Sequence, residues 1–88
     1  MTYALILSPE AQKDILAALE YTLETWGEAQ AEHYNAALDT GLKMLADNPY
    51  LGRSRTDISP KHRSFPIEKH IAVYFVEHET VYISRVLH

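Results

Sequence analysis

The chain has 88 residues, 47% of them hydrophobic, and it contains no cysteine. This length suits one domain, residues 1–88, and is too short for two independent cores, while the hydrophobic fraction excludes a disordered chain. The lack of cysteine excludes disulfides and thiolate metal sites, and the net charge of −4 fits poorly with a protein whose main ligand is nucleic acid, because such binding is largely electrostatic.

The N-terminal region carries no recognisable export signal. Its apolar run, Tyr3 to Leu7, is shorter than the core of a signal peptide and has no basic residue before it. No segment approaches the roughly 20 apolar residues that a membrane helix needs. We therefore expect a cytoplasmic protein without a membrane partner.

Charge is distributed unevenly along the chain. Residues 1–50 hold two Lys or Arg against eight Asp or Glu, whereas residues 51–88 hold six against four and four of the five histidines. Such asymmetry indicates either that the second half faces an anionic partner or that the two halves attract each other within the fold. The sequence leaves both interpretations open.

The first elements in chain order are a short strand and an amphipathic helix. Residues 3–7 are β-prone and stop at Ser8, which is a good helix N-cap when Pro9 occupies the first helical position. The helix is expected to end at Trp26-Gly27, because glycine tolerates the left-handed backbone that closes a helix. Its apolar positions recur at helical spacing: Ala11, Ile15, Ala18, Leu19 and Thr22.

A second helix is predicted from Glu28 to Asp47. Asn48-Pro49 ends it, because proline cannot continue a helix and restricts the residue before it. With the tight glycine turn, the two helices form an antiparallel hairpin. The apolar stripe of the second helix is Ala31, Tyr34, Leu38, Leu42 and Leu45, with Ala37 and Met44 alongside.

The remainder of the chain predicts one loop and three strands. Residues 49–62 are rich in turn-forming residues and are expected to be a loop. Residues 63–67 form a strand that, because of Pro66, should lie at an edge of the sheet or stop early. A strand over 71–76 looks buried on both faces, and a short turn joins it to a strand over 81–87. In that last strand one face carries Val81, Ile83, Arg85 and Leu87, and the other carries Tyr82, Ser84 and Val86.

These elements predict an α+β fold in the order β-α-α-β-β-β. It is a two-layer sandwich in which the helical hairpin packs on one face of an antiparallel sheet. The three C-terminal strands should form a meander. Pattern alone does not decide where the first strand joins the sheet.

The sequence offers no catalytic centre or metal site that we can recognise. His62, His70, His78 and His88 follow one another at intervals of eight, eight and ten residues, which is not ligand spacing on a helix or knuckle. There is no glycine-rich phosphate loop and no serine elbow. We expect no metal, no cofactor and no catalytic residue.

A cluster of cations is the strongest chemical feature. Arg53 and Arg55 lie in the predicted loop, where they could project to a phosphate or carboxylate partner or be neutralised by Asp57. Arg63 and Arg85 lie on strands whose pairing could bring them together, and Arg85 could instead belong to a buried ion pair. Lys61 and His62 complete the cluster. The aromatic residues are expected in the core: Trp26, Tyr21, Tyr34, Tyr50, Tyr74 and Tyr82.

Four stretches of the chain, in order, resemble the ParE branch of the RelE/ParE toxin superfamily. They cover essentially the whole sequence, and four motifs in register are far more specific than any one. The stretches are Tyr21-Thr22-x3-Trp26-Gly27-x2-Gln30-Ala31-x2-Tyr34, Asn48-Pro49-x2-Gly52-Arg53-x-Arg55-x-Asp57, Arg63-Ser64-Phe65-Pro66 and Ile83-x-Arg85-x-Leu87-His88.

The resemblance implies the toxin of a type II toxin–antitoxin module with a RelE/ParE-like fold. It implies a ParD-like antitoxin whose C-terminal segment wraps around the hairpin and the sheet, giving a hetero-oligomer. It also implies poisoning of DNA gyrase by protein–protein binding, without catalysis and without direct nucleic-acid binding. Interaction roles are carried over to Arg53, Arg55, Arg63 and Arg85.

The alternative is a ribosome-dependent mRNA endonuclease of the RelE type. That chemistry needs a base for the ribose 2′-hydroxyl, cations on the phosphate and an acid for the leaving oxygen. Arg63, Arg85, His70 and His88 could supply them. The acidic net charge favours gyrase poisoning over mRNA cleavage. A third possibility is a non-toxic accessory protein that only binds its antitoxin.

Overall fold

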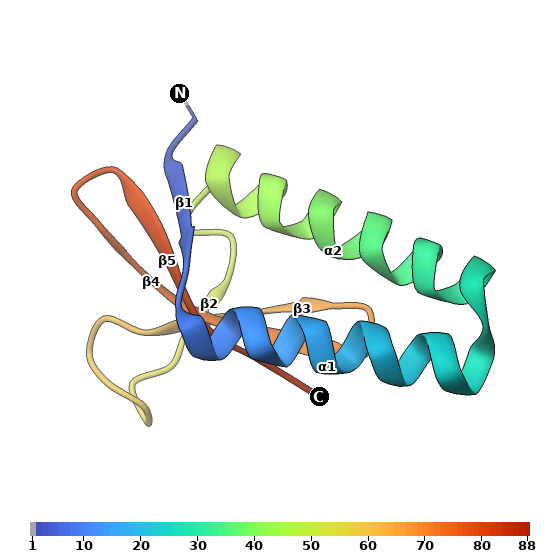
Figure 1. Cartoon of the computed structure of the whole chain (residues 1–88). Coiled ribbons are helices and arrows are strands. Elements are labelled where there is room, and N and C mark those ends of the chain that lie inside the picture. The colour runs from blue at the N-terminus through green and yellow to red at the C-terminus, as the bar shows by residue number, and fades with distance from the viewer. Residues whose placement is uncertain (1) are drawn as a thin grey trace.

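The computed structural model describes residues 2–88 as a layer of two helices against one five-stranded sheet (Figure 1). The predicted α+β sandwich is confirmed. One strand, β2, is additional and lies inside the segment predicted as a loop. The elements are β1 (Ala4–Leu7), α1 (Pro9–Trp26), α2 (Glu28–Asp47), β2 (Arg53–Ser54), β3 (Arg63–Ile67), β4 (His70–Glu77) and β5 (Thr80–Leu87).

Both helices begin and end where the sequence predicts. The Ser8 hydroxyl accepts a 2.9 Å hydrogen bond from the Ala11 N–H, which caps α1, and Pro9 is its first residue. Gly27 separates the helices with a φ of +91°, and its N–H donates to the Leu23 carbonyl at 3.0 Å. A residue with a Cβ rarely adopts that backbone, so glycine sets the hairpin turn.

The sheet order is β1-β5-β4-β3-β2. The predicted meander of β3, β4 and β5 is confirmed, but β1 pairs parallel with β5, so the sheet is mixed rather than wholly antiparallel. The prediction that residues 63–67 lie at an edge holds only in part, because β2 lies outside the start of β3. Pairing with β2 reaches only Arg63 and Ser64, so Pro66 lies on a stretch of β3 that needs no donor on that side.

A β-bulge in β5 changes which residues face the core. Val73 pairs with Arg85 and Tyr74 with Ile83, so Ser84 is an extra residue without a partner on β4. The bulge shifts the side-chain alternation by one position. Val86 is therefore buried and Arg85 exposed, whereas simple alternation had placed Arg85 on the same face as Ile83.

The core lies between the helical hairpin and the sheet and is built from apolar side chains of α2, β4 and β5. Tyr74, at its centre, is fully buried and carries a polar tip. Its hydroxyl donates to the Pro49 carbonyl at 2.8 Å and accepts from the Gly52 N–H at 2.9 Å. These two bonds attach residues 49–52 to the sheet.

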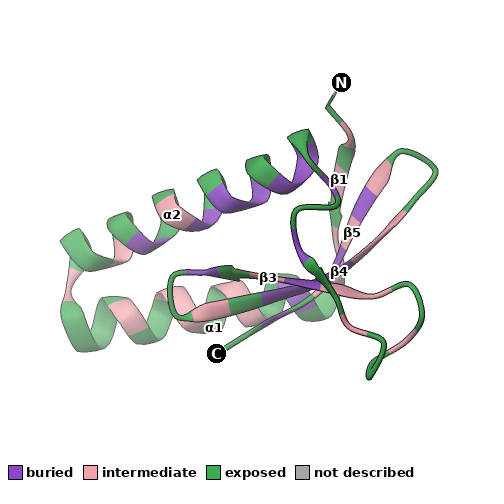
Figure 2. Ribbon diagram, turned by 180° about the vertical axis from the view of Figure 1, so that it is seen from behind, coloured by how far each residue is buried: buried purple, intermediate pink, exposed green. Residues whose placement is uncertain are grey.

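The helical hairpin extends past the sheet. In Figures 1 and 2 its Gly27 end points away from the strands, and only α2 carries a continuous buried stripe. Ala11, near the start of α1, is the one fully buried residue of that helix. Within residues 2–88, no helix is both long and apolar enough to cross a membrane.

Candidate partner-binding surfaces

Three of the four predicted arginines lie together at the β2–β3 end of the sheet. Arg53 pairs with Ser64 on the edge strand β2, and its side chain is exposed. Within residues 2–88, it is the one arginine of the four that makes no side-chain hydrogen bond or ion pair. Arg53 therefore remains available to a partner.

Arg55 is occupied inside the chain. Its guanidinium donates two parallel hydrogen bonds to the Asp57 carboxylate, at 2.9 Å and 2.8 Å, and a longer one to the Ser64 hydroxyl. The hydrogen bonds from Arg55 lower the pKa of Asp57, and the same pair raises the pKa of Arg55. Neutralisation by Asp57 was one of the two alternatives that the sequence left open, and it holds for Arg55.

Arg63 stabilises the segment before β2. Its Nε donates to the Gly52 carbonyl at 2.9 Å, and its terminal nitrogens reach Tyr50 and Ser54 at 3.5 Å. The guanidinium also lies over the Tyr50 ring, 5.3 Å from its centroid. Two of these three hydrogen bonds go to backbone carbonyls before β2, so Arg63 has a clear structural role.

Arg85 forms an ion pair with Asp14 across the gap between β5 and α1. Two parallel hydrogen bonds join the guanidinium to the carboxylate, at 2.7 Å and 2.9 Å. Oδ2 of Asp14 also accepts the Val86 N–H at 3.0 Å. The arginine is about half exposed, so the predicted ion pair is present but is not buried.

The Asp14 carboxylate should make stability depend on pH. The hydrogen bonds from Arg85 are the main cause that lowers its pKa in the fold. A lowered pKa means that this contribution is present above the unfolded-state value of about 3.9 and is lost as the pH falls below it. We therefore expect Asp14→Asn to be less stable than the parent near pH 7 and to lose less stability on acidification.

Urea unfolding at a series of pH values between about 3 and 7 would measure this difference. Asp57→Asn is the matched control, because its carboxylate is also paired with an arginine but is largely exposed. We expect that control to change little. Parallel stability curves for the parent and Asp14→Asn would contradict the role given to Asp14.

The four arginines do not form one cationic site. Arg63 faces Tyr74 on β4, not Arg85 on β5, so the expected meeting of Arg63 and Arg85 does not occur. Arg53 and Arg85 share a cross-strand row with Ser64 and Val73 between them. Three strand spacings of about 4.8 Å separate them by roughly 14 Å, too far for a single phosphate.

The other predicted cations, Lys61 and His62, lie over the sheet face that points away from the helices. Lys61 pairs with Glu77 at 3.0 Å and lies over the ring of Phe75. His62 packs edge-on against the same ring, which stacks on Tyr82. These contacts place the segment 55–62 against the sheet and restrain it.

A groove lies between α1, the first half of α2 and the ends of β4 and β5. The sequence analysis did not anticipate it, because the groove joins positions far apart in the chain. Its volume is about 1000 Å³. The lining residues are Asp14, Ala17, Ala18, Tyr21, Thr22, Trp26, Gln30, His33, Tyr34, Glu68, Lys69, His70, Arg85, Val86, Leu87 and His88. We call it the hairpin groove.

Large aromatic side chains form the outer wall of the hairpin groove. Tyr21 is 64% and Trp26 69% exposed, so the prediction that they belong to the core was wrong. Tyr50 is likewise exposed, whereas Tyr34 and Tyr74 are in the core as predicted. Exposed aromatics beside a groove are typical of protein interfaces.

Three aromatic rings meet at the floor of the groove. The His70 ring lies 4.8 Å from Tyr34 and 5.0 Å from His88, measured between centroids. Burial, and then the neighbouring His88, lower the pKa of His70. Burial raises the pKa of Tyr34. Both side chains are therefore uncharged at neutral pH.

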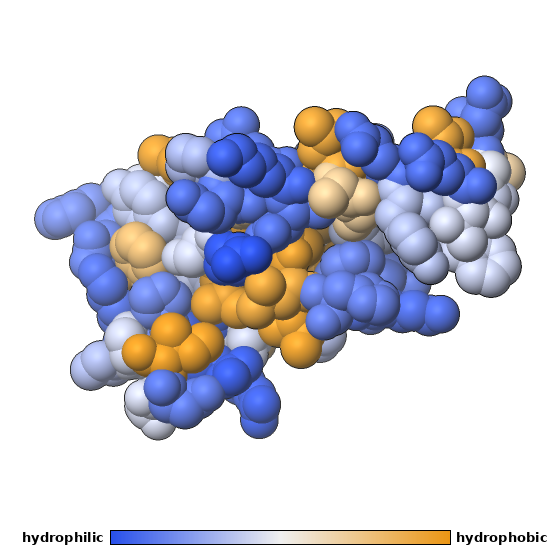
Figure 3. Space-filling model, turned by 60° about the horizontal axis from the view of Figure 1, so that its bottom comes forward, coloured by the Kyte–Doolittle hydropathy of each residue, from blue (hydrophilic) through white to orange (hydrophobic). Residues whose placement is uncertain are grey.

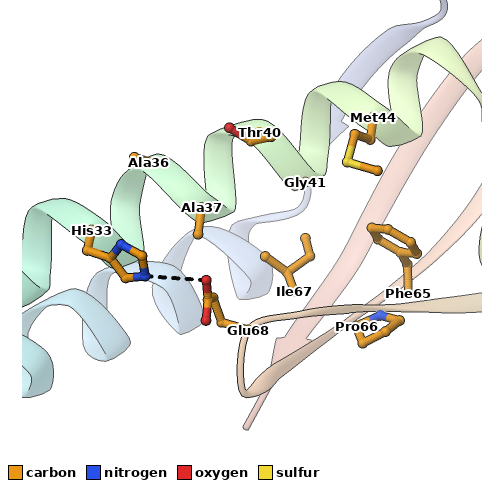
Figure 4. Close-up of a pocket in the computed structure, with 10 residues that line it drawn as sticks. All are labelled: His33, Ala36, Ala37, Thr40, Gly41, Met44, Phe65, Pro66, Ile67 and Glu68. Carbon is orange, nitrogen blue, oxygen red and sulfur yellow. Dashed lines mark ion pairs between the residues drawn. The ribbon is translucent and has the colours of Figure 1, made fainter.

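A smaller hollow of about 400 Å³ lies on the other side of α2, against β3 (Figure 4). Ala36, Ala37 and Thr40 face it from the helix, and a 3.5 Å ion pair between His33 and Glu68 lies at one end. Apolar surface is exposed elsewhere too. The space-filling view in Figure 3 shows an apolar strip at the centre of one face, bordered by hydrophilic residues.

Comparison with known sequences identifies relatives over nearly the whole chain. Residues 5–88 match the family described as ParE toxin of type II toxin-antitoxin system, parDE. Toxin ParE1 of Mycobacterium tuberculosis is 35% identical over 89 aligned positions, which cover 100% of this chain and 91% of that protein.

Solved structures with the same fold come from toxin–antitoxin complexes. A chain of the chromosomal ParDE system from P. aeruginosa superposes with a TM-score of 0.81 at 19% identity, covering 98% of this chain and 95% of that one. A chain of the RelBE2 complex from Mycobacterium tuberculosis gives a TM-score of 0.73, also at 19% identity, over 100% and 92% of the two chains. At such low identity these similarities establish the fold alone.

Proposed function

The chain belongs to the ParE toxin family of type II toxin–antitoxin systems, and from this we propose that a ParD-like antitoxin neutralises it and that, when free in the cytoplasm, it poisons DNA gyrase. The proposed action is protein–protein binding rather than catalysis. Antitoxin and gyrase would use different surfaces of the same small domain.

The hairpin groove is the observation that carries the antitoxin part of the proposal. It combines a volume of about 1000 Å³ with the exposed rings of Tyr21 and Trp26. A groove with rigid aromatic walls suits a segment that becomes ordered on binding, because the rings lose little conformational entropy. The two solved relatives come from complexes with antitoxins, which supports an antitoxin partner here.

The end of the sheet around Arg53 is our candidate for the gyrase contact. The Arg53 guanidinium is exposed on the edge strand β2 and has no internal partner within residues 2–88. Arg55, Arg63 and Arg85, which the family resemblance also implicates, are held by internal hydrogen bonds. For these three arginines we therefore propose an indirect role in binding, which is to support the surface that presents Arg53.

We expect Arg53→Glu to weaken inhibition of gyrase by about tenfold while the fold is kept, because a like charge would then face the partner's acidic groups. Purified variants would be titrated in a supercoiling assay, with circular dichroism to confirm folding. Lys13→Glu makes the same charge change at an exposed position of α1 and should leave inhibition unchanged. Full inhibition by Arg53→Glu would remove this surface from the proposal.

A second candidate function, mRNA cleavage of the RelE type, has one observation in its favour. His70, His88 and Arg85 all line the hairpin groove. Against it, the Arg85 guanidinium is held by Asp14 and Arg63 lies outside the groove. The four nuclease candidates thus are not assembled around one phosphate, and gyrase poisoning remains our first choice.

The decisive experiment runs two assays on the same purified toxin. One measures supercoiling and trapped DNA cleavage by gyrase, and the other measures cleavage of ribosome-bound mRNA. Inhibited gyrase with trapped cleaved DNA and intact mRNA is the expected result. Cut mRNA with normal supercoiling would refute the gyrase proposal and make Arg85, His70 and His88 the residues to mutate next.

A further inference from the structure

The floor of the hairpin groove contains two buried polar atoms without a hydrogen-bond partner. They are Oη of Tyr34 and Nδ1 of His70, whose rings lie 4.8 Å apart. Tyr34 is only 5% exposed. No other buried side-chain polar atom in residues 2–88 lacks a partner. Proteins rarely leave such atoms unsatisfied, so each one points to an unseen partner or a functional role.

Packing does not require the Tyr34 hydroxyl. A phenylalanine would fill the same space in the core without leaving a buried oxygen unpaired. Tyr74 shows the contrast, because its hydroxyl makes two hydrogen bonds that hold residues 49–52. In the free chain the Tyr34 hydroxyl contributes nothing comparable to the fold.

The acidic side chains that line the groove are both paired, whereas Lys69 also lines it and makes no ion pair within residues 2–88. Asp14 is paired with Arg85 on one side of the groove, and Glu68 with His33 on the other. The rings of Tyr34 and His70 are themselves uncharged at neutral pH, for the reasons given above. An uncharged amide or hydroxyl matches both atoms, because a tyrosine hydroxyl donates and accepts hydrogen bonds and a neutral imidazole nitrogen does one or the other.

The groove that Tyr34 and His70 line has room for a side chain beside their rings. Ala17 and Ala18 line the groove from α1, where longer residues would fill it, and Tyr21 and Trp26 stand at its outer edge. The α1 side of the groove thus offers apolar surface close to the polar atoms of Tyr34 and His70. This arrangement suits a side chain with an apolar stem and a polar tip.

We propose that the hairpin groove recognises one uncharged, hydrogen-bonding side chain of the antitoxin, with an amide or hydroxyl tip that pairs with Tyr34 Oη and His70 Nδ1. The inference rests on the proposed function, since it takes the antitoxin as the occupant. Beyond that function, it specifies which kind of antitoxin side chain binds in the groove. The two atoms would favour an antitoxin with a polar side chain there, because an apolar side chain would leave both atoms without a hydrogen bond.

The test compares Tyr34→Phe with the parent chain in two measurements, using the ParD-like antitoxin encoded with this toxin as the probe. Antitoxin affinity, from calorimetry, should fall about tenfold, because a buried partner group loses its hydrogen bond. The urea midpoint of the free variant should be unchanged or higher. Tyr3→Phe is the matched control, because Tyr3 lies outside the groove, and it should leave antitoxin affinity unchanged.

A spectroscopic signal tests the other atom. In ¹⁵N-histidine-labelled toxin, the Nδ1 resonance of His70 should shift on antitoxin binding as that nitrogen gains a hydrogen bond. Unchanged affinity of Tyr34→Phe with a lower urea midpoint would show that an ordered water satisfies the floor in the free chain, and would overturn the inference. A parent toxin that does not bind the antitoxin would overturn the proposed function as well.

Discussion

Replacing Gly52 with alanine is expected to destabilise the fold by about 3–5 kcal/mol, because there is no room for a methyl group at this position. A Cβ at position 52 would lie 2.5 Å from the Tyr74 hydroxyl and 2.7 Å from the Ser64 carbonyl oxygen. Neither group can move easily, because Tyr74 is fully buried and the carbonyl belongs to β3. The substitution would also break the bond from the Gly52 N–H to Tyr74.

Urea unfolding of both proteins gives the free-energy difference directly, provided that the slope of the transition stays the same. Gly41→Ala is the control. Its Cβ would meet Cδ1 and Cγ1 of the buried Ile67 side chain at 2.7 and 2.8 Å, so the packing must shift. Alanine, however, favours the helix by about 1 kcal/mol over glycine, and no hydrogen bond is broken. We therefore expect Gly41→Ala to lose less stability than Gly52→Ala.

Tyr74→Phe provides an independent check of the same contact. Removing the hydroxyl leaves the Pro49 carbonyl and the Gly52 N–H without their partner, which should cost about 1–3 kcal/mol. If both Gly52→Ala and Tyr74→Phe were as stable as the parent, the two hydrogen bonds of the Tyr74 hydroxyl would not stabilise residues 49–52, contrary to our expectation.

Saturating antitoxin should raise the melting temperature of the toxin by roughly 10–20 °C. A partner that binds only the folded chain at about a hundred times its Kd stabilises it by about 2.7 kcal/mol, and each kcal/mol shifts the melting point of a domain this small by about 4–8 °C. The effect is large because 88 residues support only a modest core. Differential scanning calorimetry of toxin, antitoxin and mixture would measure it.

Ala17→Arg provides the control for that shift. Ala17 is exposed on the wall of the hairpin groove, so an arginine there should fill the groove without disturbing the core. We expect this variant to melt like the parent alone and to gain little from antitoxin. An equal gain in both proteins would place the antitoxin elsewhere, and identical melting of the parent with and without antitoxin would refute the proposed partnership.

Local signals in the sequence were sufficient to predict the helices. Ser8-Pro9, Gly27 and Asn48-Pro49 each act within a few residues, and the structure begins and ends the helices there. The meander was equally accessible from strand periodicity. Strand β2 was missed because two residues, Arg53 and Ser54, carry no periodicity, and they form a strand only because β3 lies beside them.

Features that depend on distant pairing could not be read from the sequence. No residue near Ser84 signals the bulge in β5. The ion pair between Arg85 and Asp14 could not be predicted either, because it spans 71 positions. Likewise, Trp26 and Tyr21 were expected in the core as large aromatic residues, because the sequence does not reveal that the helices continue past the sheet. Two adjacent alanines, Ala17 and Ala18, before two large aromatics were the one local hint of a groove.

Because the helical hairpin extends past the sheet, we expect its Gly27 end to unfold locally more easily than the core. Leu45 and Tyr74 are fully buried in the core, so we expect the backbone amides around them to exchange with solvent only through global unfolding. Toward Gly27 the helices hold each other and little else, and their amides can exchange through partial opening. Occupancy of the groove would then extend the cooperative unit outward, and a protease would find the tip of the hairpin only in toxin that has lost its partner.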